Sequence, residues 1–211
     1  MRRPLFAAAA IAMMGAVHCG GAAAQQAPDL IGLVTSLPGE DKTLVNDPEI
    51  TALAPYGPGG SWEVVPAKDM FGGQALRVEV PKAGADPWSV GVNAPLTGDI
   101  AEGDVVFIAV MARAVDTDGE IGAAGARGLI STFAVQESSG AYERIVEGRA
   151  DVPVGEWDLF YAWDRADRTL TPETGTIAMH VSPQAQVLEI GPVLVMNLGP
   201  DVEEREMPKT R

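Results

Sequence analysis

The stretch from Val105 to Ala114 constrains the fold more than any other, because it predicts a strand that is apolar on both faces. Successive side chains of a strand point to opposite sides, so two rows result: Val106, Ile108, Val110 and Ala112 against Phe107, Ala109, Met111 and Arg113. A strand of this kind lies at the centre of a sheet. We expect the first row to fill a core between two sheets. The second row, which ends in a guanidinium, is a candidate floor for a binding groove.

The rest of the chain alternates short β-type segments with clusters of glycine and proline. No apolar pattern of helical period persists for more than about two turns, which predicts an almost entirely β protein. Further strands are expected at 62–65, 75–80, 88–94, 129–137, 142–147, 157–164, 176–181 and 187–196, with loops at 55–60, 116–128, 137–140 and 165–175. This spacing predicts an all-β, antiparallel sandwich formed by a single domain.

The first 24 residues have the pattern of a secretory signal peptide. Arg2 and Arg3 precede an apolar run from Leu5 to Val17, and the small residues Ala22, Ala23 and Ala24 follow. The apolar run is shorter than the about 20 residues that span a bilayer, so no membrane span is expected. We therefore predict a periplasmic or secreted protein that begins near Gln25, with an N-terminal extension over residues 25–43.

Composition excludes several partners and reactions. Without residues 1–24 the chain keeps 211 − 24 = 187 residues, no cysteine, one histidine and a net charge of 13 − 29 = −16. Nucleic acids and anionic lipids require a basic surface, so neither is an expected partner. A cysteine or serine triad and a zinc site lack the His and Cys residues that they need. A pair of glycosidase carboxylates stays open, because acidic residues are plentiful.

The order of several segments resembles the jelly-roll carbohydrate-binding modules of the cellulose- and xylan-binding type, which are galactose-binding-domain-like and often appended to glycoside hydrolases. ALRVEVP, DPWSV, an LxxGD connection and a strand ending in AR follow one another at residues 75–81, 86–90, 96–104 and 112–114. GEWDLFYAWD, TIAMHV and QVLEIGPVLVMNLG continue the likeness, at 155–164, 176–181 and 186–199. The resemblance implies a module over residues 44–199, followed by a solvated, charged tail over 200–211.

Sugar binding requires flat aromatic faces for the pyranose ring and planar polar groups for its hydroxyls. By resemblance and strand alternation, the candidate ligand-binding residues are Trp88, Arg113, Gln136, Tyr142 and His180. Trp88 is the expected stacking platform. In the strand 157–164 the orientation stays open: Tyr161 and Trp163 are core if the apolar majority decides, and face the groove if Phe160 is core.

The resemblance also implies a structural calcium ion held by carboxylates near both ends of the domain. Asp47, Glu49 and Glu189 are the acids at those places. Calcium prefers six to eight oxygen ligands, so carbonyl partners would have to complete the site.

Two functions follow from these observations. The first is a secreted, non-catalytic protein that binds a β-linked polysaccharide or oligosaccharide, such as xylan or a β-glucan, alone or with a partner enzyme. The second is a cell-envelope interaction domain that kept the sandwich without sugar binding, and it predicts a groove filled by Phe107, Met111 and other apolar side chains. A small polysaccharide-cleaving enzyme on the same fold is a third, weaker interpretation.

Overall fold

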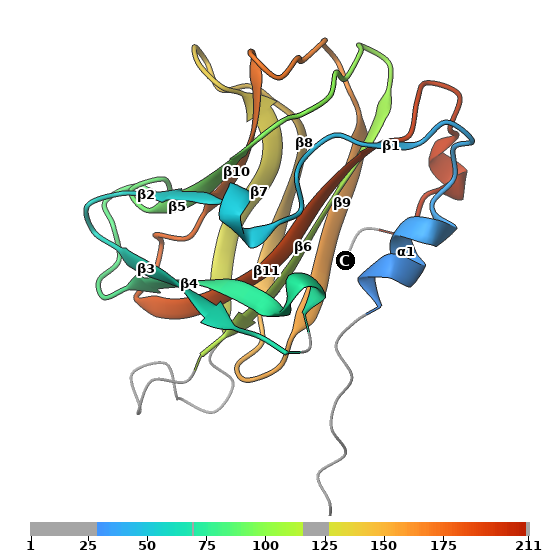
Figure 1. Ribbon diagram of the computed structural model, residues 1–211. Coiled ribbons are helices and arrows are strands. Elements are labelled where there is room, and N and C mark those ends of the chain that lie inside the picture. The colour runs from blue at the N-terminus through green and yellow to red at the C-terminus, as the bar shows by residue number, and fades with distance from the viewer. Residues whose placement is uncertain (1–28, 69, 116–126, 210–211) are drawn as a thin grey trace, which may run out of the picture.

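The computed structural model describes residues 29–68, 70–115 and 127–209 (Figure 1). The signal peptide prediction and most of the loop expected at 116–128 lie outside these residues. The described helices are α1 (Leu30–Ser36) and the 3₁₀ turns η1 (Ile50–Ala52), η2 (Phe71–Gly73) and η3 (Glu204–Glu206). The strands are β1 (Thr43–Leu44), β2 (Ala54–Tyr56), β3 (Ser61–Pro66), β4 (Gln74–Val80), β5 (Gly91–Pro95), β6 (Val105–Ala114), β7 (Gly128–Glu137), β8 (Arg144–Val152), β9 (Asp158–Arg165), β10 (Gly175–His180) and β11 (Gln186–Asn197).

Two antiparallel sheets pack face to face, which confirms the predicted all-β sandwich. One sheet has six strands in the order β3-β4-β11-β6-β9, with β1 paired to β11. The other has five strands in the order β2-β5-β10-β7-β8. Strands distant in sequence are neighbours in both sheets, as in a jelly roll, and β6 lies between β11 and β9 (Figure 1).

The main core lies between the sheets and contains the first row of β6. Val106, Ile108, Val110 and Ala112 are fully buried there, as predicted. They meet Ile130, Phe133, Val135, Ile177 and Met179 from the facing sheet. Burial of this much apolar surface is the main term that stabilises the sandwich.

The second row of β6 is not the floor of a groove, and that prediction is wrong. Phe107, Ala109 and Met111 are buried in a second apolar cluster on the outer face of the six-stranded sheet. Leu30 and Leu37, at the two ends of α1, close this cluster together with Val202 and Met207 from the C-terminal segment. Figure 1 shows the blue helix beside the red C-terminal segment. The chain covers this face itself, so no ligand can lie on it over Phe107.

The C-terminal segment is also not the solvated tail that its charge suggested. Val202 and Met207 are buried, and two backbone carbonyls near the end accept hydrogen bonds from β9. Trp163 Nε1 donates to the oxygen of Pro208 at 2.8 Å, and Tyr161 Oη donates to that of Lys209 at 3.0 Å. Phe160 is therefore the core residue of β9, and both aromatic side chains pack beneath the chain's own C-terminal segment.

Two local predictions also fail. Trp88 lies in the turn before β5, because Ser89 N–H bonds back to the carbonyl of Asp86 at 3.0 Å. The helix α1 was not expected, since its seven residues are too few to give a periodic pattern. Asp29 caps it, accepting a hydrogen bond from Gly32 N–H at 2.8 Å.

Candidate functional site

The outer face of the five-stranded sheet differs from that of its partner, because it carries polar and small side chains. We call it the polar face. Strand register places its side chains opposite to those of the core: Tyr56, Gly91, Asn93, Thr132, Ala134, Gln136, Glu147, Thr176, Ala178 and His180. In the middle of this face Gly91, Ala134 and Ala178 have at most a methyl side chain, and all three are buried.

One end of the polar face gathers three rings. Tyr56, Gly91, His180 and Thr132 stand side by side on four neighbouring strands. The ring of Trp88 meets that of His180 edge to face, with centroids 6.4 Å apart. A Cβ on Gly91 would come within 2.5 Å of Tyr56 Oη, so only glycine lets the tyrosine ring lie across β5 here.

Two charged groups of β8 border the polar face, with Glu147 opposite Ala134 and Arg144 opposite Gln136. Thr132 Oγ1 donates to Glu147 Oε1 at 3.2 Å, and Arg144 Nη1 donates to the same oxygen at 2.5 Å. The carboxylate of Glu147 is thereby tied to two neighbours. This arrangement suits a group that orients others better than one that must exchange protons with a substrate.

Gln136 lies at the opposite end of the polar face, and Tyr142 belongs to the turn that follows, between β7 and β8. Gln136 faces Thr176 on β10 and Arg144 on β8, and it is only 6% exposed. Its Oε1 has no hydrogen-bond partner within the described part of the chain. A buried amide oxygen without a partner is unfavourable, but this oxygen is enclosed and does not face solvent.

Two aromatic side chains mark the two ends of the polar face and reach solvent. Trp88 is 56% exposed and Tyr142 is 55% exposed. Thr176 and His180, at the two ends of the face on β10, are four residues apart, or about 13 Å at about 3.3 Å per residue. His180 and Gln136 are less than a tenth exposed. A ligand would therefore first contact the exposed side chains of Trp88, Tyr142 and Arg144.

Arg113 does not belong to this site. It lies on the outer face of the other sheet, where its Nε and Nη2 both reach Glu189 Oε2 at 2.7 Å. Its guanidinium also lies 4.9 Å from the ring centroid of Trp157. The prediction that Arg113 joins Gln136 and His180 is wrong, because β6 and β10 belong to different sheets.

The residues proposed for calcium do not fit that ion. Glu189 is 1% exposed, and its other oxygen accepts from Arg77 Nη2 at 2.6 Å, so two guanidiniums occupy the carboxylate. Asp47 Oδ1 instead accepts the backbone N–H of Glu49 at 3.0 Å. Within residues 29–68, 70–115 and 127–209 no three acidic, histidine or cysteine side chains are placed to hold a metal. Glu189 acts as the centre of an ion-pair triad.

Burial lowers the pKa of His180 below its ordinary value of 6.5. The positive charge of Arg144 acts in the same direction, and the negative charge of Glu147 opposes it. The imidazole on the polar face is therefore held neutral over most of the physiological range, as an uncharged group beside the ring of Trp88.

A pH-dependent loss of stability is expected from this histidine. Because the folded state lowers the pKa of His180, the unfolded chain binds the proton more readily, and the free energy of unfolding falls as the pH drops below about 6.5. Replacing His180 with asparagine removes this contribution. Thermal unfolding of both proteins should be measured between pH 8 and pH 5. The stability advantage of the wild type over the asparagine variant should shrink toward low pH, and an advantage that stays constant contradicts the lowered pKa of His180.

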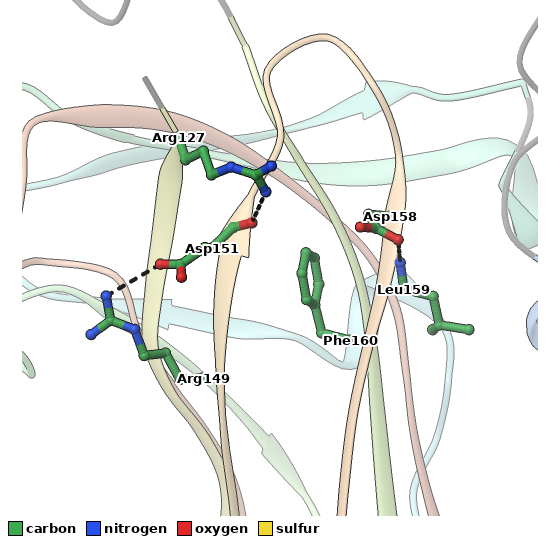
Figure 2. A pocket seen from close by; sticks show the side chains of 6 residues that line it. All are labelled: Arg127, Arg149, Asp151, Asp158, Leu159 and Phe160. Carbon is green, nitrogen blue, oxygen red and sulfur yellow. Dashed lines mark hydrogen bonds and ion pairs between the residues drawn. The ribbon is translucent and has the colours of Figure 1, made fainter. Parts of the chain in front are cut away.

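A surface pocket lies elsewhere, at the edge where β8 of one sheet meets β9 of the other. Its volume is about 270 Å³. Figure 2 shows Asp151 between the guanidiniums of Arg127 and Arg149, with Phe160 and Asp158 across the pocket. Arg127 Nη1 donates to the backbone oxygen of Asp151 at 3.1 Å, and Arg149 Nη2 to its carboxylate at 3.2 Å. Phe160 is the aromatic residue that lines the pocket and it is buried, so the pocket lacks an exposed stacking platform.

Sequence reasoning missed three members of the polar face. Tyr56 was placed in a loop, because a strand of three residues gives no alternation to recognise. Arg144 and Glu147 were placed correctly on a strand, but the contact of Glu147 with Thr132 depends on the pairing of β7 with β8. The position of Tyr56 before a glycine-rich turn could have pointed to it. Arg144 and Glu147 are three residues apart, which regular alternation places on opposite faces, and only the register shift between β7 and β8 puts both on the polar face.

Comparison with known proteins identifies the fold. No family model and no curated protein matches this sequence. Among solved structures, a CBM4 module superimposes with a TM-score of 0.50 at 17% identity, covering 70% of this chain and 94% of the module. The CBM22-1 xylan-binding domain of Paenibacillus barcinonensis Xyn10C gives 0.50 at 12% identity, covering 77% of this chain and 97% of that one. The second N-terminal cellulose-binding domain of Cellulomonas fimi β-1,4-glucanase C gives 0.50 at 20% identity, covering 73% and 90%.

These matches support the jelly-roll sandwich expected from the sequence. At identities of 12–20%, these superpositions show a shared fold alone. The ligand has to be argued from this chain's own residues. No helix within the described residues is long and apolar enough to cross a membrane.

Proposed function

We propose that this protein is a secreted or periplasmic, non-catalytic carbohydrate-binding protein that takes a β-linked polysaccharide, such as xylan or a β-glucan, on its polar face. The structures with the same fold include a xylan-binding and a cellulose-binding domain. A shared fold does not imply a shared ligand, so the proposal depends on the residues of the polar face itself.

The observation that carries the proposal is the contrast between the two outer sheet faces. One is sealed by the chain's own apolar residues, whereas the other keeps polar groups between Trp88 and Tyr142, whose rings are more than half exposed. Exposed aromatic rings at both ends of a polar surface suit a long ligand with apolar ring faces and hydroxyl edges.

Charge supports a neutral ligand over a charged one. The chain carries 29 acidic and 15 basic residues, and a polyanion would be repelled by this excess. Arg144, the exposed cation of the polar face, is already paired with Glu147. Binding without catalysis is favoured, because Glu147 is held by Thr132 and Arg144. A partner enzyme could then act on the polysaccharide that the protein holds.

We expect retention of the protein lacking residues 1–24 on insoluble xylan, cellulose or a mixed β-glucan, and release by a soluble oligosaccharide of the same sugar. Exposed hydrogen bonds contribute only about 0.5–1.5 kcal/mol each, so stacking on the rings should dominate the affinity. A pull-down from each polysaccharide, with the sedimented fraction measured, tests this. Failure to sediment with any of them contradicts sugar binding.

The interaction-domain interpretation has one observation of its own. Trp62 and Val64 lie on the edge strand β3, and both are exposed, as is Phe71 nearby in the chain. An unprotected apolar edge is typical of strands that pair with another chain. The filled face over Phe107 and Met111, which this interpretation predicted, is filled by the protein's own helix and C-terminal segment.

A further inference from the structure

Tyr142 is held in an unfavourable backbone conformation at the end of the polar face. Its φ of 54° is the only positive value among the non-glycine residues that the structure describes. A side chain with a Cβ is disfavoured in this left-handed region, and burial does not compensate here because the tyrosine is exposed. Such a conformation persists only where the surroundings impose it, and residues of this kind gather at functional sites.

The surroundings that impose it centre on Arg168. This residue belongs to the connection between β9 and β10, yet its guanidinium contacts both residues that flank the turn carrying Tyr142. Nη1 lies 3.2 Å from Glu137 at the end of β7, and Nη2 pairs with Glu143 just before β8. Asp167 holds the same guanidinium from the other side, with its Oδ1 3.0 Å from Nε. One planar fork therefore closes the base of the turn.

Backbone contacts from the same connection hold the turn as well. Ser138 N–H donates to the carbonyl of Thr174 at 2.8 Å, and Ser138 Oγ donates to that of Glu173 at 3.3 Å. Inside the turn, Glu143 N–H reaches Glu137 Oε2 at 3.4 Å. Glu137 thus shares its two oxygens between Arg168 and the turn it closes.

The ion pairs of Arg168 have little reason to exist for stability alone. The Arg168 side chain is 30% exposed and its partners are 30–60% exposed, and ion pairs this open to solvent contribute little to folding, because water screens them and two long side chains must be ordered. A guanidinium with several carboxylate partners instead fixes geometry, since its donors form a rigid planar fork. The hydrogen bonds of Asp167, Glu143 and Glu137 also raise the pKa of Arg168, so the fork stays charged.

We propose that Arg168 is a positioning residue that holds Tyr142 outward as one of the two aromatic platforms for the ligand. The proposal rests on the proposed function, in which the polar face binds a polysaccharide. The affinity for the ligand would then depend on Arg168, a residue of the β9–β10 connection. Arg168 does not contact the ligand itself and acts by fixing the turn that carries Tyr142.

The test uses Arg168→Gln, Tyr142→Ala and the double variant, with Arg205→Gln as the matched control. Arg205 also forms an exposed ion pair, with Glu203, but it lies in the C-terminal segment. Without ligand, amide hydrogen exchange at Glu143 and Ser138 should become at least about tenfold faster in Arg168→Gln and stay unchanged in Arg205→Gln. Arg168→Lys, which keeps the charge but loses the fork, should lie between them.

With the polysaccharide that retains the wild type, or a soluble xylan oligosaccharide, Arg168→Gln should lower the affinity about three- to tenfold, the range of one aromatic contact. It should have no further effect when Tyr142 is already alanine. Unchanged exchange at Glu143 overturns the proposal whether or not any sugar binds. Unchanged affinity in Arg168→Gln, while Trp88→Ala loses binding, overturns it and leaves the proposed function standing. Absence of binding by the wild type sinks the proposed function and with it the platform role of Tyr142.

Discussion

Replacing both Arg77 and Arg113 with methionine is expected to lower the free energy of unfolding by about 3–5 kcal/mol. The two guanidiniums hold the carboxylate of Glu189 from both sides, with contacts of 2.6 and 2.7 Å, and that side chain is 1% exposed. Hydrogen bonding to Glu189 also raises the pKa of Arg77, so this partner remains charged. Without them the carboxylate is left buried and unpaired. Urea unfolding of the wild type and the double variant at pH 7 measures the loss.

A third substitution shows whether the lost stability comes from the unpaired carboxylate of Glu189 or from the lost packing of the two arginine side chains. Adding Glu189→Leu to the double variant removes the stranded carboxylate, so stability should return to within about 1 kcal/mol of the wild type. The prediction fails if the double variant loses less than about 1 kcal/mol, or if the leucine does not restore it. Wild-type stability in the triple variant would also be incompatible with a structural calcium ion that needs Glu189 as a ligand.

The sandwich was predictable from the sequence because it depends on patterns within single strands. The two apolar faces of β6 identify a central strand without knowledge of its neighbours, and Val106 and Ile108 lie in the core as expected. Glycine and proline between the strands gave most of the boundaries to within a few residues. These signals are local, so one sequence suffices to read them.

The site was harder to predict, because it depends on which strands share a sheet. Alternation correctly placed Arg113, Gln136 and His180 opposite the core, yet it cannot tell that β6 and β10 lie in different sheets. Nor can it reveal that α1 and the C-terminal segment cover one outer face. The role of Glu189 could not be predicted for the same reason. The resemblance made this acid of the last strand a candidate calcium ligand, and its two arginine partners come from the neighbouring strands β4 and β6.

Trp88→Ala is expected to remove binding while leaving the fold intact. The ring is 56% exposed and touches His180 only edge to face, so its loss removes little buried surface. The exposed indole ring is the expected stacking platform for a sugar, so affinity should fall at least about tenfold, which equals about 1.4 kcal/mol. Trp62→Ala is the matched control, because Trp62 is a similarly exposed tryptophan on β3 of the other sheet.

The most direct test of the account is the fraction of protein retained on the polysaccharide that binds the wild type, compared for Trp88→Ala and Trp62→Ala, with the melting temperature of each. The account predicts that Trp88→Ala is lost from the polysaccharide, Trp62→Ala is retained like the wild type, and both melt within a few degrees of it. Full retention of Trp88→Ala, or its unfolding, would contradict the account.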